Sequence, residues 1–335
     1  MIIDYASRCR PAKLQTNTEG EVIGRGKYGT VRIVDEKTVV KVIDVELSGD
    51  RWDVKAKQAY REYVVGVLQR LVVSGGHTPH LVIHFSGRME VVGDRRCALQ
   101  LYMERFECSL DKGPKQVLSS EAQWMSMYLQ LSSGVATLAL LLGAVHNDLY
   151  PRNVLLRRLP RELRVVYDVC GTQYLGVHET LFAIADFGIC GSPLFGCGRS
   201  CNPGLRLNSV ETPRLFGQTN TEQHILKYAE LPPFSRDIYV LFKWPTGGLA
   251  SIYSVPQPVL AWSLRVLRYV DEHLDSFTKP RAVADLLSVA FSEQVLSSPA
   301  RQDFSLRPED ADSLLAMAAE ELRRDRFGVA KGLKR

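Results

Sequence analysis

Residues 146–153 pack polar side chains closely together and read His146-Asn147-Asp148-Leu149-Tyr150-Pro151-Arg152-Asn153. They directly follow a long segment without charged residues, which indicates a polar site held on a rigid apolar scaffold. Asp148 can accept a proton from an attacking hydroxyl, and the amide oxygen of Asn153 can bind a metal ion. A turn rich in Asn, Asp and Pro uses the same residue types, so the rest of the chain must decide between a site and a turn.

The segment before this loop, residues 122–147, carries no Asp, Glu, Lys or Arg and is long enough to span a bilayer. It also contains Gln, Ser and Thr, and its apolar positions recur at helical spacing: Trp124, Tyr128, Leu131, Val135, Leu138 and Leu142. This spacing is typical of one face of an amphipathic helix. We therefore expect a buried core helix and no association with a membrane.

A glycine-rich segment near the N-terminus reads Gly24-Arg25-Gly26-Lys27-Tyr28-Gly29-Thr30-Val31. It lies within residues 19–45, where β-branched residues predict a strand on each side of it. A dinucleotide-binding turn would need a helix to follow. A glycine hairpin can instead fold over a nucleotide and bring backbone N–H groups close to its phosphates, although any tight turn could use the same residues.

Three charged residues elsewhere need partners. Lys41 lies among β-branched residues of a predicted central strand, where its ammonium requires a carboxylate or a phosphate unless the strand is an edge that faces water. Glu62, on a helix predicted over residues 56–72, can supply the carboxylate. Asp186 begins the sequence Asp-Phe-Gly after a predicted strand, where a carboxylate suits a hard cation such as Mg²⁺.

The remaining patterns complete an α+β fold class. Residues 81–85 and 97–103 are expected to be strands separated by a turn at residues 93–94, and helical patterns follow near residues 257–274, 281–296 and 308–324. The N-terminal quarter is therefore expected to be mostly sheet with one helix, and the C-terminal half mostly helix.

Taken in order, the glycine-rich loop, the strand Lys, the helix Glu, the His-x-Asp-x-x-x-x-Asn loop and Asp-Phe-Gly resemble the protein-kinase signature set over about residues 19–245. The resemblance implies a two-lobed fold, with a small antiparallel sheet and one helix next to a larger, mostly helical lobe. It implies the following division of the chain: an N-terminal extension (1–18), an N-terminal lobe (19–106) and a C-terminal lobe (107–335), with an inserted hairpin at 157–180 around Cys170-Gly171.

The resemblance also implies an ATP- and Mg²⁺-dependent enzyme that acts on a protein substrate. The implied ATP-binding residues are Gly24, Gly26, Gly29, Val31 and Lys41, with Met103 guarding the adenine pocket and Glu104 to Phe106 forming the hinge. Asn153 and Asp186 would bind Mg²⁺. The implied catalytic set is Asp148 as base, Lys41 paired with Glu62, and Arg152 acting on the γ-phosphate. Asp237 is similar to the aspartate that anchors the catalytic loop from a core helix.

The sequence departs from the family pattern at several positions. Asn147 stands where most protein kinases have the Arg that reads a phosphorylated activation loop, and no Ala-Pro-Glu follows Asp-Phe-Gly. Arg152 matches one tyrosine-kinase pattern, whereas Pro151 matches the serine/threonine pattern, which we favour. Divergent kinases of large DNA viruses look similar, and that narrower resemblance implies the cytoplasm or nucleus of a virus-infected host cell.

Two functions of other classes fit parts of the pattern. A His-Asn-Asp loop followed by Asn at this spacing also resembles choline and ethanolamine kinases, although the complete glycine-rich loop and the Phe-Gly after Asp186 favour a protein kinase. A pseudokinase would be a binding module without the chemistry. The sequence does not support that loss, because the residues of the reaction are all present: Lys41, Asp148, Asn153 and Asp186.

Composition limits the class of protein further. The 335 residues carry 42 Lys+Arg and 37 Asp+Glu, a net charge of +5 that is too dilute to indicate binding to nucleic acid. The cysteines number seven and are scattered, which predicts an intracellular, reducing compartment. Cys190, Cys197 and Cys201 lie close together with Cys170 upstream, but they contain no Cys-x-x-Cys pair, so free thiols are favoured over zinc. Nothing in the sequence defines an oligomeric state.

Overall fold

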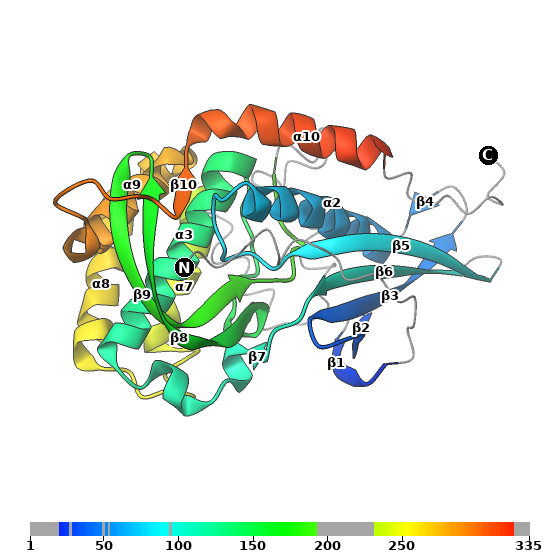
Figure 1. The fold of residues 1–335 in the computed structure, drawn as a ribbon, viewed down its shortest axis with the longest axis horizontal. Helices are drawn as coiled ribbons and strands as arrows, with labels where there is room; N and C mark the ends of the chain where they lie inside the picture. The colour runs from blue at the N-terminus through cyan, green and yellow to red at the C-terminus, as the bar shows by residue number, and fades with distance from the viewer. Residues whose placement is uncertain are drawn as a thin grey trace.

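The structure of the protein is a computed structural model that describes residues 20–26, 29–48, 51–52, 54–93, 96–192 and 231–324. The predicted N-terminal extension, 1–18, lies outside these ranges, as do Cys197 and Cys201. Within them the chain is α+β, with a six-stranded antiparallel sheet, a four-stranded sheet and helices (Figure 1). This confirms the predicted fold class at that level.

The six-stranded sheet forms from the N-terminal segments rich in β-branched residues. Its strands are β1 (Val22–Gly26), β2 (Gly29–Ile33), β3 (Thr38–Ser48), β4 (Arg51–Trp52), β5 (His84–Gly93) and β6 (Arg96–Glu104). They lie in the order β1-β2-β3-β6-β5, with β4 paired to β3. The hairpin predicted for the glycine-rich segment is confirmed, and Gly26 pairs with Gly29 at its turn.

The strand predicted at residues 81–85 is displaced. Strand β5 begins only at His84, whereas the apolar run before it is a buried connection between the two sheets. The Val82 N–H donates to the carbonyl of Ile184, and the Ile83 carbonyl accepts from the N–H of Glu104. A short apolar run is as consistent with a buried connection as with a strand, which explains the error.

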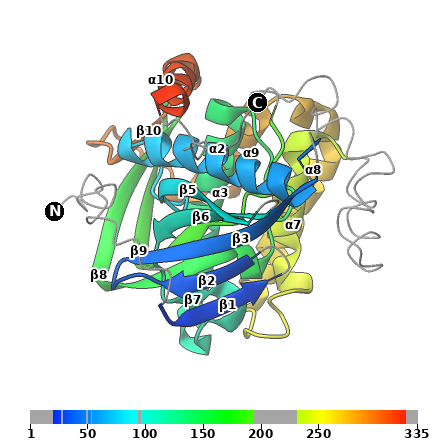
Figure 2. The same ribbon diagram turned by 90° about the vertical axis from the view of Figure 1, so that its right-hand side faces the viewer.

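Helix α2 (Val54–Ser74) packs against the six-stranded sheet, contacting β3 and β5, and confirms the helix predicted over residues 56–72 (Figure 2). Its Val65 and Val72 are fully buried. Gly66 allows a close approach to β5, because a Cβ there would lie 2.4 Å from the His84 ring. The helix that carries Glu62 is therefore fixed closely to the sheet that carries Lys41.

Helix α3 (Glu121–Leu142) is the buried centre of the remaining fold. Ser120 caps it: its Oγ accepts from the Gln123 N–H at 3.3 Å, and its own N–H donates to Gln123 Oε1 at 3.2 Å. Gly143 ends it in the left-handed region, with φ of +52°. The residues of the predicted apolar face are all at most 3% exposed: Trp124, Tyr128, Leu131, Val135, Leu138 and Leu142.

By length and composition, α3 is also the one described helix that could cross a membrane. In the structure 89% of its most apolar stretch is buried within the protein. A single helix of this kind is weak evidence for a membrane span, because a core helix has the same composition when it is enclosed on all sides.

The second sheet consists of β7 (Cys108–Ser109), β8 (Val154–Val169), β9 (Thr172–Ile184) and β10 (Phe304–Leu306). Strands β8 and β9 form a long hairpin in which Tyr167 pairs with Tyr174, as predicted for the strands around Cys170-Gly171. Both turn residues have positive φ, +53° and +89°. Strand β10 adds to β8 in parallel, so the C-terminal part of the chain contributes to this sheet.

The C-terminal helices are α7 (Pro233–Lys243), α8 (Gln257–Glu272), α9 (Arg281–Ala290) and α10 (Ala311–Arg324). Single turns of 3₁₀ helix lie at Leu110–Lys112, Lys115–Leu118, Pro151–Asn153, Trp244–Thr246, Leu274–Thr278, Ser292–Gln294 and Pro308–Asp310. Helix α9 ends six residues before its predicted end, because Phe291 leaves the helical region with φ of −116° and ψ of +33°. Helix α10 lies apart from the others, along α2 (Figures 1 and 2).

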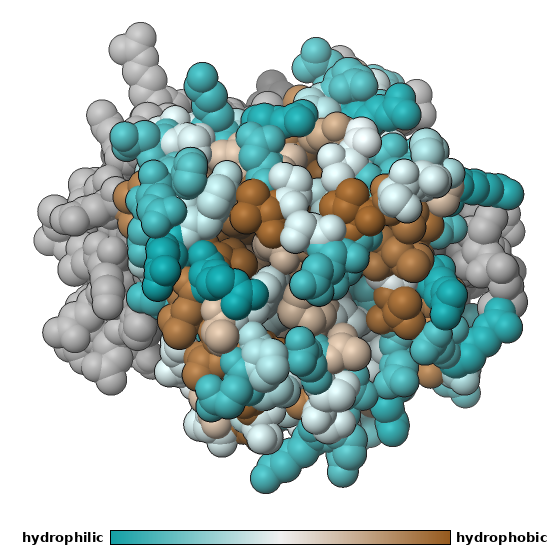
Figure 3. All heavy atoms as spheres, turned by 90° about the vertical axis from the view of Figure 1, so that its left-hand side faces the viewer, coloured by the Kyte–Doolittle hydropathy of each residue, from teal (hydrophilic) through white to brown (hydrophobic). Residues whose placement is uncertain are grey.

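The surface on the left-hand side of Figure 1 mixes polar and apolar side chains (Figure 3). Apolar side chains form several separate groups among polar ones on that face. The large apolar side chains that the described residues expose are likewise distributed over several elements: Ile23, Val177, Leu264, Val289, Val295 and Met317. Scattered apolar residues are normal on a protein surface, so the apolar side chains on this face indicate no particular function.

Candidate active site

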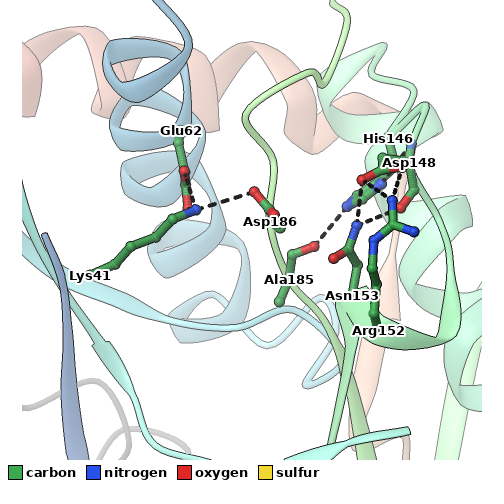
Figure 4. A network of polar contacts seen from close by, with 8 residues as sticks. All are labelled: Lys41, Glu62, His146, Asp148, Arg152, Asn153, Ala185 and Asp186. Atoms are coloured by element: carbon green, nitrogen blue, oxygen red, sulfur yellow. Dashed lines mark hydrogen bonds and ion pairs between the residues drawn. The ribbon is translucent and has the colours of Figure 1, made fainter. Parts of the chain in front are cut away.

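Lys41 forms a buried cluster of charges with two carboxylates. It lies on the central strand β3, and its Nζ is 2.8 Å from both Glu62 carboxylate oxygens and 3.3 Å from Asp186 Oδ1 (Figure 4). Only 9% of Lys41 and 3% of Glu62 is exposed, so each charge depends on the other for compensation. The structure thus contains the predicted Lys41–Glu62 pair and adds Asp186 to it.

The protonation of this cluster follows from its charges. Burial by itself would lower the pKa of the Lys41 ammonium, but the Asp186 and Glu62 carboxylates outweigh it and hold that pKa above its usual range. The Lys41 charge in turn lowers the pKa of Asp186. Lys41 therefore stays positive and Asp186 negative across the neutral pH range.

Asp186 is held in an unusual backbone conformation. It follows the end of β9 and has a φ of +63°. Among the described residues, only three that are not glycine have positive φ: Asp186 itself, Asn147 next to Asp148, and Cys170 in the β8–β9 turn. Such conformations are disfavoured for residues with a Cβ and persist where the surroundings enforce them, often at functional sites.

Asp148 is the centre of a second cluster, in the loop after α3. The Asn153 Nδ2 donates to the Asp148 carboxylate at 2.7 Å and to its backbone carbonyl at 2.8 Å, and Arg152 Nη2 donates to the carboxylate at 2.8 and 3.1 Å. Burial raises the pKa of Asp148, and the Arg152 charge offsets part of that shift. A positioned carboxylate with a raised pKa is suited to accept a proton from a hydroxyl.

The loop that carries Asp148 is held in place by a side chain of helix α7. The carboxylate of Asp237 accepts from the backbone N–H of His146 at 2.6 Å and from that of Asn147 at 3.0 Å. Asp237 is 3% exposed, so these are buried, charge-assisted hydrogen bonds. The anchoring contact implied for Asp237 by the resemblance is present.

His146 links this loop to the segment around Asp186. Its Nε2 lies 2.9 Å from the carbonyl oxygen of Ala185, and its ring packs edge-on against that of Phe187 with centroids 4.7 Å apart. The Ala185 N–H in turn donates to the Asn153 carbonyl at 2.8 Å. Figure 4 shows the result: the two clusters lie on either side of one backbone segment.

A cavity of about 680 Å³ brings the predicted residues together. Every predicted site residue except Gly26 lines it: Gly24, Gly29, Val31, Lys41, Glu62, Met103, Glu104, Phe106, Asp148, Arg152, Asn153 and Asp186. Gly26 lies at the tip of the β1–β2 hairpin, where it pairs with Gly29. The volume is within the range of small-molecule sites.

Sequence reasoning missed other residues that line this cavity, chiefly its apolar walls: Val39, Val82, Leu155 and Ala185. Val39 could have been found, since it lies two residues before Lys41 and so shares its face of the strand. The others lie on segments joined only by the fold, and no local pattern identifies them. Cys108 and Ser109 of β7 and Lys112 of the following 3₁₀ turn are also lining residues that the sequence did not mark.

The segment after β6 offers backbone groups to the cavity. The N–H groups of Glu104, Arg105 and Glu107 donate to the carbonyls of Ile83, Lys37 and Leu156. In the described part of the chain, the Phe106 N–H between them donates to no protein acceptor. An unused donor beside an apolar wall is suited to bind a heteroaromatic ring. Arg157 supports this segment, since it donates to Glu104 at 3.0 Å and lies over the Phe106 ring.

The metal-binding capacity of the site depends on two side chains. Because its Nδ2 donates to Asp148, Asn153 presents its Oδ1 as an acceptor, and Asp186 presents a carboxylate. Oxygen donors of this kind fit Mg²⁺ when phosphate oxygens complete its ligands. No group of three or more His, Cys, Asp or Glu side chains that could hold a metal ion occurs among the described residues. Two of the four cysteines considered for zinc lie outside them.

The chain matches no protein-family model and no curated protein sequence.

Proposed function

We propose that the protein is an ATP- and Mg²⁺-dependent protein kinase with the two-lobed fold of that family and Asp148 as its catalytic base. The strongest support is that residues far apart in the sequence meet in one cavity. Lys41 and Asp186 are 145 positions apart in the chain, yet they share an ion pair and line one cavity with Asp148 and Asn153. An Asn- and Pro-rich turn alone would give no reason for this arrangement.

The residues at the Asp148 end fit the transfer of a phosphoryl group to a hydroxyl. The Asp148 carboxylate is oriented by Asn153 and can accept the proton that the acceptor hydroxyl releases as it attacks. Arg152 brings a positive charge 2.8 Å from that carboxylate. Because Arg152 is more than half exposed, it can turn toward a γ-phosphate when one is present.

The residues at the Lys41 end fit the binding of the phosphate chain. Gly24 and Gly29 of the β1–β2 hairpin line the same cavity as Lys41, so their backbone and the Lys41 ammonium can contact the same phosphates. Asn153 and Asp186 would hold Mg²⁺, which when bound supplies charge neutralisation for the phosphates. Phosphoryl transfer requires mainly positioning and such charge neutralisation.

The apolar end of the cavity fits the adenine ring. Val82, Met103 and Leu155 provide apolar walls, and the unused Phe106 N–H is available for a ring nitrogen. A purely anionic ligand such as polyphosphate would have no use for this part of the cavity. We therefore propose ATP as the donor. Because Pro151 matches the serine/threonine pattern, we propose the hydroxyl of a protein Ser or Thr as the acceptor.

Labelled ATP tests the proposal directly. The purified protein is incubated with γ-labelled ATP and Mg²⁺, alone, with a mixed protein substrate, and with choline or ethanolamine, with Asp148→Asn as the control. Acid-stable label on Ser or Thr that is absent with Asp148→Asn is the expected result. Label on choline or ethanolamine without label on protein would replace the proposal by a small-molecule kinase. ATP binding without any transfer would replace it by a pseudokinase.

A further inference from the structure

Helix α10 lies along α2, the helix that carries Glu62 (Figures 1 and 2). Leu314 and Ala318, one helical turn apart, are 2% and 3% exposed. Glu321 follows on the same face at the next turn. Met317, at the edge of this face, is 48% exposed. Helix α10 is thus an amphipathic helix whose buried side ends in a carboxylate.

That carboxylate forms an ion pair with Arg70 of α2. Both side chains are partly buried, with 22% of Arg70 and 30% of Glu321 exposed. Arg70 also donates from Nη1 to the Phe85 carbonyl at 2.7 Å. One guanidinium therefore connects three elements: α2, strand β5 and α10. An arginine fork is suited to such a junction because its donors have fixed directions.

The C-terminal segment also holds the end of α2. The Ser305 N–H in β10 donates to the Gly76 carbonyl at 3.1 Å, and the Ser305 carbonyl lies 2.8 Å from His77 Nδ1. Gly76 and His77 lie two and three residues after the end of α2, and the His77 N–H donates back to the carbonyl of Val72. The segment Phe304–Arg324 therefore contacts α2 at its C-terminal end and along its length.

We infer that this C-terminal segment positions Glu62, with Arg70 and Glu321 as positioning residues. Arg70 is eight residues from Glu62 on the same helix, or about 12 Å along a rigid axis. A shift or rotation of α2 would carry Glu62 away from Lys41, whose Nζ it contacts at 2.8 Å. A displacement of about 1 Å at such a contact is costly for catalysis. The inference deepens the proposed function and rests on it.

Charge exchange in the full-length chain tests the inference. Arg70→Glu and Glu321→Arg are each expected to lower kcat at saturating ATP about 5- to 10-fold, because each turns an attraction into a repulsion. The double variant Arg70→Glu/Glu321→Arg restores the ion pair in reverse but not the hydrogen bond to the Phe85 carbonyl, so it is expected to recover part of the loss. Asp312→Arg, the same charge change at an exposed position of α10, is expected to stay within twofold of the wild type.

Two readouts separate positioning from general stability. Active sites are titrated with a non-hydrolysable ATP analogue, so that kcat is given per folded molecule, and amide hydrogen exchange of α2 is measured in the same samples. Positioning predicts a lower kcat per site and faster exchange of α2 in the single variants, with both effects partly reversed in the double variant. An unchanged kcat per site, or a double variant no better than the single ones, would overturn the inference. A wild-type protein that transfers no phosphate would instead refute the proposed function.

Discussion

Replacing Lys41 by Met is expected to destabilise the fold as well as the reaction. Met keeps the apolar part of the side chain but leaves the Glu62 carboxylate, which is 3% exposed, without a counter-charge. At 2.8 Å the two charges attract by about 6 kcal/mol for an effective dielectric constant of about 20, and desolvation of both offsets much of that. Removing only one partner leaves the desolvation cost, so the free energy of unfolding should fall by about 3 kcal/mol.

A double-mutant cycle in urea unfolding measures this coupling. Glu62→Gln removes the carboxylate charge that Lys41→Met leaves unpaired. The Lys41→Met/Glu62→Gln variant should therefore recover about 2 kcal/mol of the lost free energy of unfolding. Phosphoryl transfer should nevertheless stay about 10²-fold or more below wild type in all three variants, because each lacks the charge or the charge pair at the phosphates. A Lys41→Met protein as stable as wild type would refute the reasoning. So would a double variant whose loss of unfolding free energy equals the sum of the two single losses.

Three further outcomes follow from the site and the core. Asp148→Asn should lower kcat by about 10²- to 10⁴-fold with ATP affinity within about twofold of wild type, and a parallel loss of binding would make Asp148 structural. Because burial raises the pKa of Asp148, the fall of kcat on the acid side of its pH profile should occur at a higher pH than the pKa of an ordinary aspartate. Arg152→Leu should move that fall to a still higher pH, because the Arg152 charge opposes the shift. Burial lowers the pKa of both His84 and His178 to about 3 from 6.5 in the unfolded chain. The contribution of each histidine to the free energy of unfolding is then fully present above pH 6.5 and is lost as the pH falls toward 3. Each should have lost about 2 kcal/mol at pH 5. Urea unfolding measured against pH checks this, and a flat profile would contradict it.

Much of this fold could be predicted because its signals are local. The spacing from Trp124 to Leu142 gave the central helix, and β-branched residues on both sides of Gly24 gave the hairpin. Periodicity failed where burial came from tertiary packing alone. The run from Leu81 to Ile83 is apolar because it joins two sheets, and its sequence does not differ from that of a strand.

The charged and polar members of the site were predictable because each has few structural uses in an apolar setting. Lys41 among β-branched residues required a partner, and Glu62 is that partner. The cavity walls were not predictable, since Val82 and Leu155 are ordinary core residues in sequence terms. The positive φ of Asp186 was also beyond local reasoning, because the contacts around it, from Asp186 to Lys41 and from Ala185 to Asn153, join segments far apart in the chain.

Transfer from γ-labelled ATP across a Mg²⁺ titration, with the wild type and Asp186→Asn side by side, tests the central claim most directly. Asp186→Asn keeps the size of the side chain and removes the charge that would bind the metal and that pairs with Lys41. The account predicts label transfer that rises with Mg²⁺ in the wild type, disappears with a chelator, and falls at least about 10²-fold in the variant at every concentration. Equal transfer by both proteins, or transfer that does not depend on Mg²⁺, would contradict it.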